Sequence, residues 1–184
     1  MNHVEETLSL PQSIEQQDVV YQDRNQKIHK VLARFKGFNK EYFVADHGPR
    51  AAIVAVRRGE VLLVRQYRLV INALSYEIPG GRISAGEEPM AAAARECFEE
   101  SGVQCRHLKP LISYHPGLDI CRNYTSVFYT EEVDDANQGD PDRRVWVPLS
   151  RGIDMVRTQE ILDSLSIIAL LAYRLLRTAA GHGA

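Results

Sequence analysis

Cysteine is scarce in this sequence, and long apolar runs are missing. The 184 residues include three cysteines and no Cys-x-x-Cys pair, which argues against a disulfide scaffold or a zinc cluster and is typical of a reducing compartment. The longest apolar stretch, residues 165–173, is shorter than the roughly 20 residues that cross a bilayer. The opening residues lack the basic start and apolar core of a signal peptide. We therefore expect a cytoplasmic protein without a membrane partner.

The chain also lacks an excess of charge of either sign. Its formal net charge is −2, which gives no reason to expect nucleic acid or an anionic membrane as a partner. Any binding of anions must then depend on local arginines. The composition, 45% hydrophobic and 25% charged, is that of an ordinary globular domain.

Turn residues divide the chain into two parts. From Val19 to Asp46, apolar and polar residues alternate loosely, which predicts two or three antiparallel strands. The stretch Asp-His-Gly-Pro at 46–49 then breaks the pattern. We therefore predict an N-terminal extension of residues 1–47 and a main domain of residues 48–184.

The main domain combines strands with two helices. Residues 51–56 form a continuous apolar run, typical of a strand that is covered on both faces. Further strands are predicted at residues 61–68, 73–77, 123–130 and 143–149, with an acidic loop at 131–142. Helices are predicted at about 88–101 and 161–180. This pattern indicates an α/β fold, with helices packed on a mixed sheet.

Three glutamates crowd the helix at 88–101. Pro89 suits its first turn and Gly102 suits its end. We expect one face to pack on the sheet and the other to carry the charges; the first is formed by Met90, Ala91, Ala94, Cys97 and Phe98, and the second by Ala92, Glu96, Glu99 and Glu100. Such a charged face is usually only solvated.

The spacing of the glutamates favours a metal site instead. Glu96 and Glu100 are four positions apart, where like charges repel on a helix, and Glu99 flanks them. A divalent cation would remove this repulsion, since Mg²⁺ takes carboxylate oxygens together with substrate phosphates. The Pro-Gly-Gly loop at 79–81 lets backbone approach a ligand closely.

Residues 81–103, GRISAGEEPMAAAARECFEESGV, resemble the Nudix box. The matching positions are Gly81, Glu87, Arg95, Glu96, Glu99, Glu100, Gly102 and Val103. Cys97 stands where the box has an aliphatic residue, and we interpret it as a small buried apolar side chain.

The resemblance implies the Nudix α/β/α sandwich around a mixed sheet. It also implies Mg²⁺- or Mn²⁺-dependent hydrolysis of a nucleoside diphosphate linked to another group. Glu96, Glu100 and the carbonyl of Gly80 are the implied metal ligands, and Glu99 is a further ligand or orients water. Structural support of the site is implied for Gly81, Glu87, Arg95 and Gly102.

Flanking motifs resemble the ADP-ribose pyrophosphatase branch over most of residues 45–180. These are VRQYR, YEIPGG, a His-Pro-Gly loop and a long C-terminal helix. The implied substrate-binding residues are Arg65, Arg68, Glu77 and Gly117. We expect Arg65 and Arg68 to share one face of their strand, where arginine suits phosphate. Either arginine could instead be a plain surface residue, and Glu77 a plain ion-pair partner.

The general base is open among several acids. In the family a glutamate on a mobile loop before a late strand often activates the water, whereas the late part of that stretch here offers Asp140 and Asp142 instead of glutamates. Glu99 on the box helix is the alternative, and earlier acids of the same stretch are also candidates: Glu131, Glu132, Asp134 and Asp135.

The resemblance also implies a homodimer, formed through the N-terminal strands and helped by the last helix. The implied reaction is cleavage of ADP-ribose to AMP and ribose 5-phosphate. GDP-mannose or another sugar nucleotide is the alternative substrate. A non-catalytic module that senses ADP-ribose is the alternative of another class.

Overall fold

The computed structural model describes residues 10–118, 120–135 and 143–181. The described chain forms two units, one from the ranges 1–49 and 115–123 and the other from the ranges 50–114 and 124–184. The first unit holds one sheet, and the second holds a seven-stranded sheet and a two-stranded one. The domain boundary predicted between residues 47 and 48 stays a prediction.

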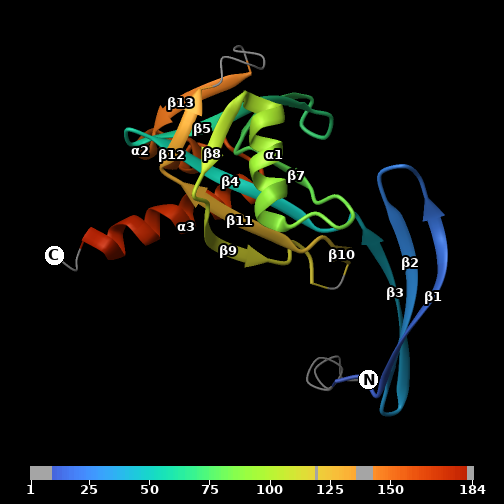
Figure 1. The fold of residues 1–184 in the computed structure, drawn as a ribbon. Coiled ribbons are helices and arrows are strands. Elements are labelled where there is room, and N and C mark those ends of the chain that lie inside the picture. Colours follow the sequence, from blue (N-terminus) through green and yellow to red (C-terminus); the bar gives the residue numbers. More distant parts are fainter. Residues whose placement is uncertain (1–9, 119, 136–142, 182–184) are drawn as a thin grey trace. The chain divides into compact units, whose positions relative to one another are not determined.

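The first unit is a four-stranded sheet, drawn in blue to teal in Figure 1 except for its last strand. Its strands are β1 (Ser13–Gln22), β2 (Lys27–Phe35), β3 (Phe38–Asp46) and β10 (Cys121–Arg122). The first three pair antiparallel in chain order, and β10 runs parallel to β3. Gly37, with φ of 97°, makes the tight turn between β2 and β3. The predicted antiparallel strands are confirmed, although the first begins at Ser13 rather than at Val19.

The second unit is built on a seven-stranded sheet with the order β13-β5-β4-β11-β9, to which β6 adds on β5 and β7 on β4. β11 runs parallel to β4 and antiparallel to β9, so the sheet is mixed, as predicted. Its strands are β4 (Arg50–Arg57), β5 (Glu60–Arg68), β6 (Ala73–Glu77), β7 (Gly80–Arg82), β9 (Lys109–Tyr114), β11 (Thr125–Thr130) and β13 (Arg144–Pro148).

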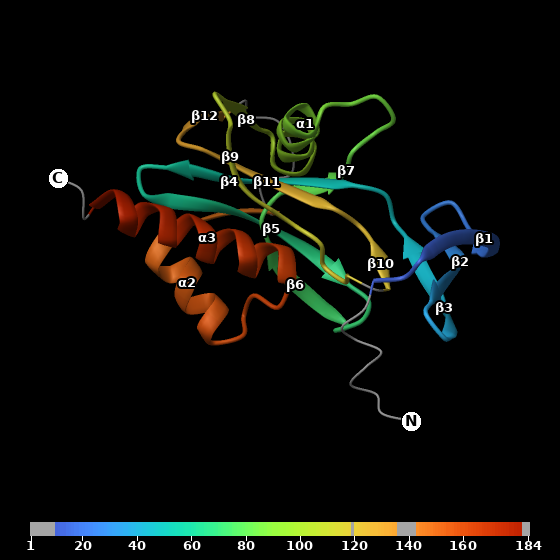
Figure 2. The same cartoon turned by 90° about the horizontal axis from the view of Figure 1, so that it is seen from below.

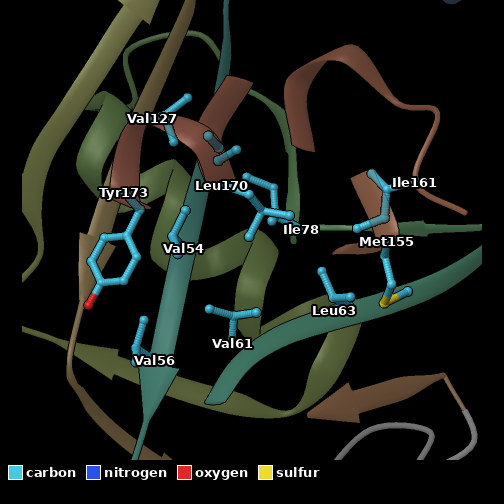
Figure 3. Packing of buried hydrophobic residues seen from close by; sticks show 12 residues of the cluster. Val54, Val56, Val61, Leu63, Ile78, Val127, Met155, Ile161, Leu170 and Tyr173 are labelled. Atoms are coloured by element: carbon cyan, nitrogen blue, oxygen red, sulfur yellow. The ribbon is translucent and has the colours of Figure 1, made fainter. Parts of the chain in front are cut away.

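Helices cover both faces of this sheet (Figure 2). One face carries α1 (Pro89–Ser101), and the other carries α2 (Leu149–Arg157) and α3 (Ser164–Gly181). Successive residues of β4 alternate between the two sides: Ile53 packs in the cluster under α1, and Val54 in the cluster with Leu170 and Tyr173 of α3 (Figure 3). The prediction that residues 51–56 form a strand covered on both faces is therefore confirmed.

Some short elements were not predicted. β12 (Glu132–Asp135) lies in the stretch predicted to be an acidic loop, and it pairs antiparallel with β8 (Val103–Arg106). The helix α2 was also missed. The helix predicted at 161–180 begins instead at Ser164, because the Asp163 carboxylate accepts the Ser166 N–H at 2.8 Å and caps it. Within the described ranges, no helix is long and apolar enough to cross a membrane.

The helix α1 has the predicted ends. Pro89 lies in its first turn, and Gly102 closes it with φ of 70° and an N–H bond to the Phe98 carbonyl at 2.8 Å. The predicted faces were wrong in part, since Met90 is 41% exposed and Ala91 is exposed. The buried residues of the helix are Ala92, Ala93, Cys97 and Ser101. Glu96 and Glu100 therefore border the buried face instead of lying opposite it.

Candidate active site

Gly80 and Gly81, the first residues of β7, bring the backbone close to β4 and α1. A Cβ on Gly80 would lie 2.5 Å from the Cβ of Ala52, which is its partner in the β4–β7 pairing. A Cβ on Gly81 would lie 2.2 Å from the carboxylate carbon of Glu96. Real Cβ atoms do not approach this closely, so both positions need glycine for space rather than for a left-handed backbone. The Glu96 carboxylate lies directly on the Gly81 backbone.

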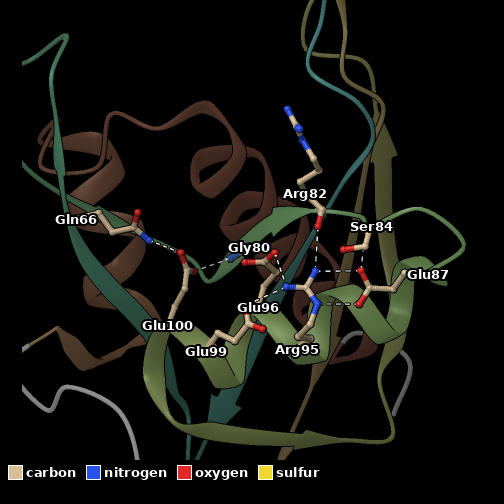
Figure 4. A network of polar contacts seen from close by, with 9 residues as sticks. All are labelled: Gln66, Gly80, Arg82, Ser84, Glu87, Arg95, Glu96, Glu99 and Glu100. Carbon is tan, nitrogen blue, oxygen red and sulfur yellow. Dashed lines mark hydrogen bonds and ion pairs between the residues drawn. The ribbon is translucent and has the colours of Figure 1, made fainter. Parts of the chain in front are cut away.

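Glu100 approaches the same loop from one turn further along α1 (Figure 4). Its Oε2 accepts the Gly80 N–H at 3.0 Å, and its Oε1 accepts a hydrogen bond from the Gln66 amide at 2.5 Å. Burial raises the pKa of Glu100, and the nearby Glu96 charge adds to the rise, while both hydrogen bonds and the Arg143 guanidinium oppose it. The carboxylates of Glu96 and Glu100 thus lie at two successive glycines.

Arg95 contacts three glutamates from the outer side of α1. Its guanidinium donates to Glu87 at 2.8 Å and 3.0 Å, to Glu96 at 2.8 Å and to Glu99 at 3.0 Å. It also donates to the Arg82 carbonyl at 3.0 Å. The Arg95 hydrogen bonds lower the pKa of Glu87 to about 2, and Glu87 and Glu96 in turn raise the pKa of Arg95. Arg95 therefore binds one carboxylate oxygen of Glu96. It also binds Glu99, whose side chain is half exposed.

Arg68 and Glu77 form an ion pair between β5 and β6. The Arg68 Nε–H donates to Glu77 Oε1 at 2.7 Å, and its terminal nitrogen contacts Oε2. Glu77 is buried while Arg68 stays half exposed. Glu77 is therefore an ion-pair partner of Arg68. Substrate contact by either residue stays a prediction.

The prediction that Arg65 and Arg68 share a face is wrong. Side chains alternate along β5, so residues three apart point to opposite faces. Leu62 packs under α1 and Leu63 packs on the α3 side, which puts Gln66 and Arg68 toward α1 and Arg65 away from it. The Nε of Arg65 is buried and finds no acceptor among the residues that the structure describes.

Gln66 was missed by sequence reasoning. The alternation from Leu62 would have identified its side as that of the glutamates, but an uncharged amide on a strand gives no signal of its own.

The candidate bases lie in different surroundings. Asp140 and Asp142 fall outside the described residues. Glu131 accepts hydrogen bonds from Tyr173 and Arg177 of α3, on the face of the sheet opposite α1. The Oε2 of Glu132 lies 3.6 Å from the Nε2 of His107, and the Oδ2 of Asp134 lies 2.6 Å from a terminal nitrogen of Arg106. Glu99 is the candidate that lies on α1 beside Glu96.

Gly117 belongs to the first unit, where its carbonyl accepts the Cys121 N–H at 3.2 Å. Its contact with substrate stays a prediction.

A family model described as the NUDIX domain matches residues 46–163, which is more than half of the chain. The chain belongs to the Nudix family. The ADP-ribose pyrophosphatase of Mycobacterium tuberculosis (strain ATCC 25618 / H37Rv) is 31% identical over 143 residues, which cover 73% of this chain and 69% of that protein. The CMP-5'-(N-acetyl-N-hydroxy-3-aminopropyl)phosphonate hydrolase of Streptomyces rubellomurinus is 26% identical over 139 residues, covering 72% of this chain and 66% of that protein.

A solved structure extends the likeness beyond the Nudix domain. The crystal structure of an ADP compounds hydrolase matches with a TM-score of 0.77, covering 95% of this chain and 98% of that one, at 19% identity. At this identity the match shows the fold alone. The predicted Nudix sandwich, with its small N-terminal sheet, is confirmed.

The Nudix family implies a divalent cation, and the chemistry of the donors fits one. Glu96 and Glu100 offer hard carboxylate oxygens at the Gly80–Gly81 backbone, the kind of ligand that Mg²⁺ and Mn²⁺ take. Among the described residues, no three His, Cys, Asp or Glu side chains are grouped closely enough to hold a metal by themselves. The pair of Glu96 and Glu100 suits Mg²⁺, which is usually held by one or two carboxylates with water and substrate phosphate as the other ligands.

Proposed function

We propose that this Nudix hydrolase cleaves the pyrophosphate bond of ADP-ribose, giving AMP and ribose 5-phosphate, with Mg²⁺ or Mn²⁺ as cofactor. The observation that carries the proposal is the pair of carboxylates, Glu96 and Glu100, held at two successive glycines. The M. tuberculosis relative named ADP-ribose pyrophosphatase supports the choice of substrate.

In this proposal Glu96, Glu100 and the Gly80 carbonyl hold the cation. When bound, the cation would neutralise phosphate charge and make a water more acidic. Arg95 keeps Glu96 on the Gly81 backbone, and Glu87 in turn orients Arg95. Gln66 and the Gly80 N–H fix the two oxygens of Glu100, so that this carboxylate has one orientation.

We propose that the substrate binds at Arg68 and Glu77, on the α1 side of the sheet, and not at Arg65, which points away from α1. Arg68 is half exposed and already paired to Glu77, so a diphosphate would bind a guanidinium that Glu77 holds in place. A carboxylate must accept the proton of the attacking water, and we assign this to Asp140 or Asp142, or to Glu99 on α1.

A substrate panel tests the function. Purified protein with Mg²⁺ is given ADP-ribose, ADP-glucose, GDP-mannose, NADH or diadenosine polyphosphates, and release of mononucleotide is measured. We expect ADP-ribose to have the highest kcat/KM. Fast cleavage of GDP-mannose with ADP-ribose ignored would refute the substrate, and tight ADP-ribose binding with no turnover of any compound would favour the sensing module.

A matched pair of variants tests the metal site. Glu100→Gln keeps the size of the side chain and removes its charge, and Glu88→Gln makes the same change at the exposed N-cap of α1. Loss of a residue that only supports a metal ligand costs about 10–100-fold, so loss of a ligand should cost more than about 100-fold. We expect this fall for Glu100→Gln and little change for Glu88→Gln. Full activity of Glu100→Gln would refute the assignment.

We also propose the homodimer that the resemblance implies. Light scattering of the purified chain measures its mass in solution, and we expect twice the 20.8 kDa of one chain. A monomer at working concentration would refute it.

A further inference from the structure

Two cysteine thiols are in contact at the buried face of α1, the helix that carries the glutamates. The Sγ of Cys97 on α1 lies 3.4 Å from the Sγ of Cys105 on β8. Cys97 is completely buried and Cys105 is partly exposed. All three cysteines are free thiols, and Cys121 belongs to the first unit. Cys97 and Cys105, the two thiols in contact, are therefore the two cysteines of the second unit.

The separation of the two sulfur atoms is close to what a covalent bond needs. A disulfide has an S–S length of about 2.05 Å, so the atoms must approach by roughly 1.4 Å. Cys97 and Cys105 are eight positions apart, joined through the end of α1 and the turn at Gly102. The bond would tie α1 directly to β8, two elements that already share the apolar cluster around Cys97.

The geometry points to Cys97 and Cys105 as an oxidation site, where a hydroperoxide converts the two thiols into an internal disulfide. This assignment does not depend on the reaction that the enzyme catalyses. It gives Cys97, which stands where the Nudix box has an aliphatic residue, a chemistry that an aliphatic side chain cannot have.

The reaction balances in two steps. Hydrogen peroxide transfers one oxygen to the sulfur of Cys105, the partly exposed residue of the pair, which becomes a sulfenic acid while the peroxide is reduced to water. The sulfur of Cys97 then attacks the Cys105 sulfur, the S–S bond forms, and the hydroxide that leaves takes the Cys97 proton as a second water. Two thiols and one peroxide give one disulfide and two waters.

Peptide mapping detects the bond directly. The reduced full chain is treated with hydrogen peroxide under native conditions, then unfolded and alkylated. Trypsin places both cysteines in one peptide, residues 96–106, and cleavage after Glu99 and Glu100 divides that peptide between them. We expect the two pieces to stay joined until a reductant is added, with only Cys121 alkylated.

Matched variants keep the test sharp. Cys97→Val, an aliphatic replacement, and Cys105→Ala should each abolish the joined product, whereas Cys121→Ser should leave it unchanged. Separate pieces after oxidation, with Cys105 alkylated or carried on to sulfinic acid, would overturn the proposal. So would a bond from either residue to Cys121.

A second readout connects this site to the glutamates and rests on the proposed function. Cys97 directly follows Glu96, and displacing reacting groups by about 1 Å can cost around 100-fold in rate. We expect the oxidised protein to lose about 10–100-fold in kcat and to recover on reduction, with Cys97→Val insensitive to peroxide. If the joined peptide forms and the rate is unchanged, the coupling is refuted; if reduced protein is inactive on every substrate, the proposed function fails while the mapping still decides the disulfide.

Discussion

Replacing Ser166 with alanine tests how α3 fixes the loop that carries the two glycines. The Ser166 hydroxyl is fully buried, accepts the Ile78 N–H at 2.9 Å and donates to the Asp163 carboxylate at 2.7 Å. Ile78 is 3% exposed, so water cannot take over the lost bond. Leaving one buried N–H without an acceptor costs about 1–3 kcal/mol. The cap of α3 adds little to this cost, because the Ser166 N–H still donates to Asp163.

Urea unfolding measures this loss. For a domain whose unfolding free energy falls by about 2 kcal/mol per molar urea, a loss of 2 kcal/mol lowers the midpoint by about 1 M. Ser164→Ala, an exposed serine of the same helix, is the control and should change the unfolding free energy by less than about 0.5 kcal/mol. If Ser166→Ala is as stable as this control, the hydrogen bond to Ile78 does not hold the loop.

The same variant should affect the site. Ile78 precedes Gly80 by two positions, and the Gly80 N–H binds Glu100. A loosened loop holds Glu100 less well, so we expect a higher Mg²⁺ concentration at half-maximal rate. A purely structural role would lower stability and leave this concentration unchanged.

Three further predictions follow from single contacts. Gly81→Ala would push the Glu96 carboxylate away, so we expect hydrolysis to fall by more than about tenfold with little change in melting temperature, because the end of a side chain can move. Gly80→Ala would drive a Cβ into Ala52 on β4, and calorimetry should show a loss of about 1–3 kcal/mol. Burial raises the pKa of Tyr114 to about 12, so stability present below pH 10 is lost as the pH rises through 12; Tyr114→Phe should flatten the fall in unfolding free energy over that window, measured by urea titration at each pH.

Sequence reasoning succeeded where one residue fixes a local conformation. Pro89 and Gly102 set the ends of α1, and the apolar run at 51–56 indicated a strand buried on both faces. The buried face of α1 was harder to predict. Residues 91–94 are four alanines with identical side chains, so hydrophobicity does not distinguish one side of the helix from the other. Which of them are buried depends on where the sheet lies, and the helix sequence does not contain that information.

The positions of the arginines on β5 needed only the period of a strand. Applied from Leu62, that period places Gln66 and Arg68 on the α1 side and Arg65 on the other. The short strands β8 and β12 are different, because four residues each give too little pattern to distinguish a strand from a loop. Their pairing is a tertiary contact that joins the end of α1 to the chain after β11.

The structure also changes the physical reason for expecting a cation. From the sequence, the crowding of Glu96 and Glu100 was a repulsion between neighbours on a helix. In the fold, Arg95 contacts Glu96 and Glu99, but the Glu96 charge still raises the pKa of Glu100. Glu100 instead receives its hydrogen bonds from neutral donors, Gln66 and the Gly80 N–H, and burial raises its pKa. The preference for positive charge at Glu100 therefore comes first from burial against the loop, which only the folded chain creates.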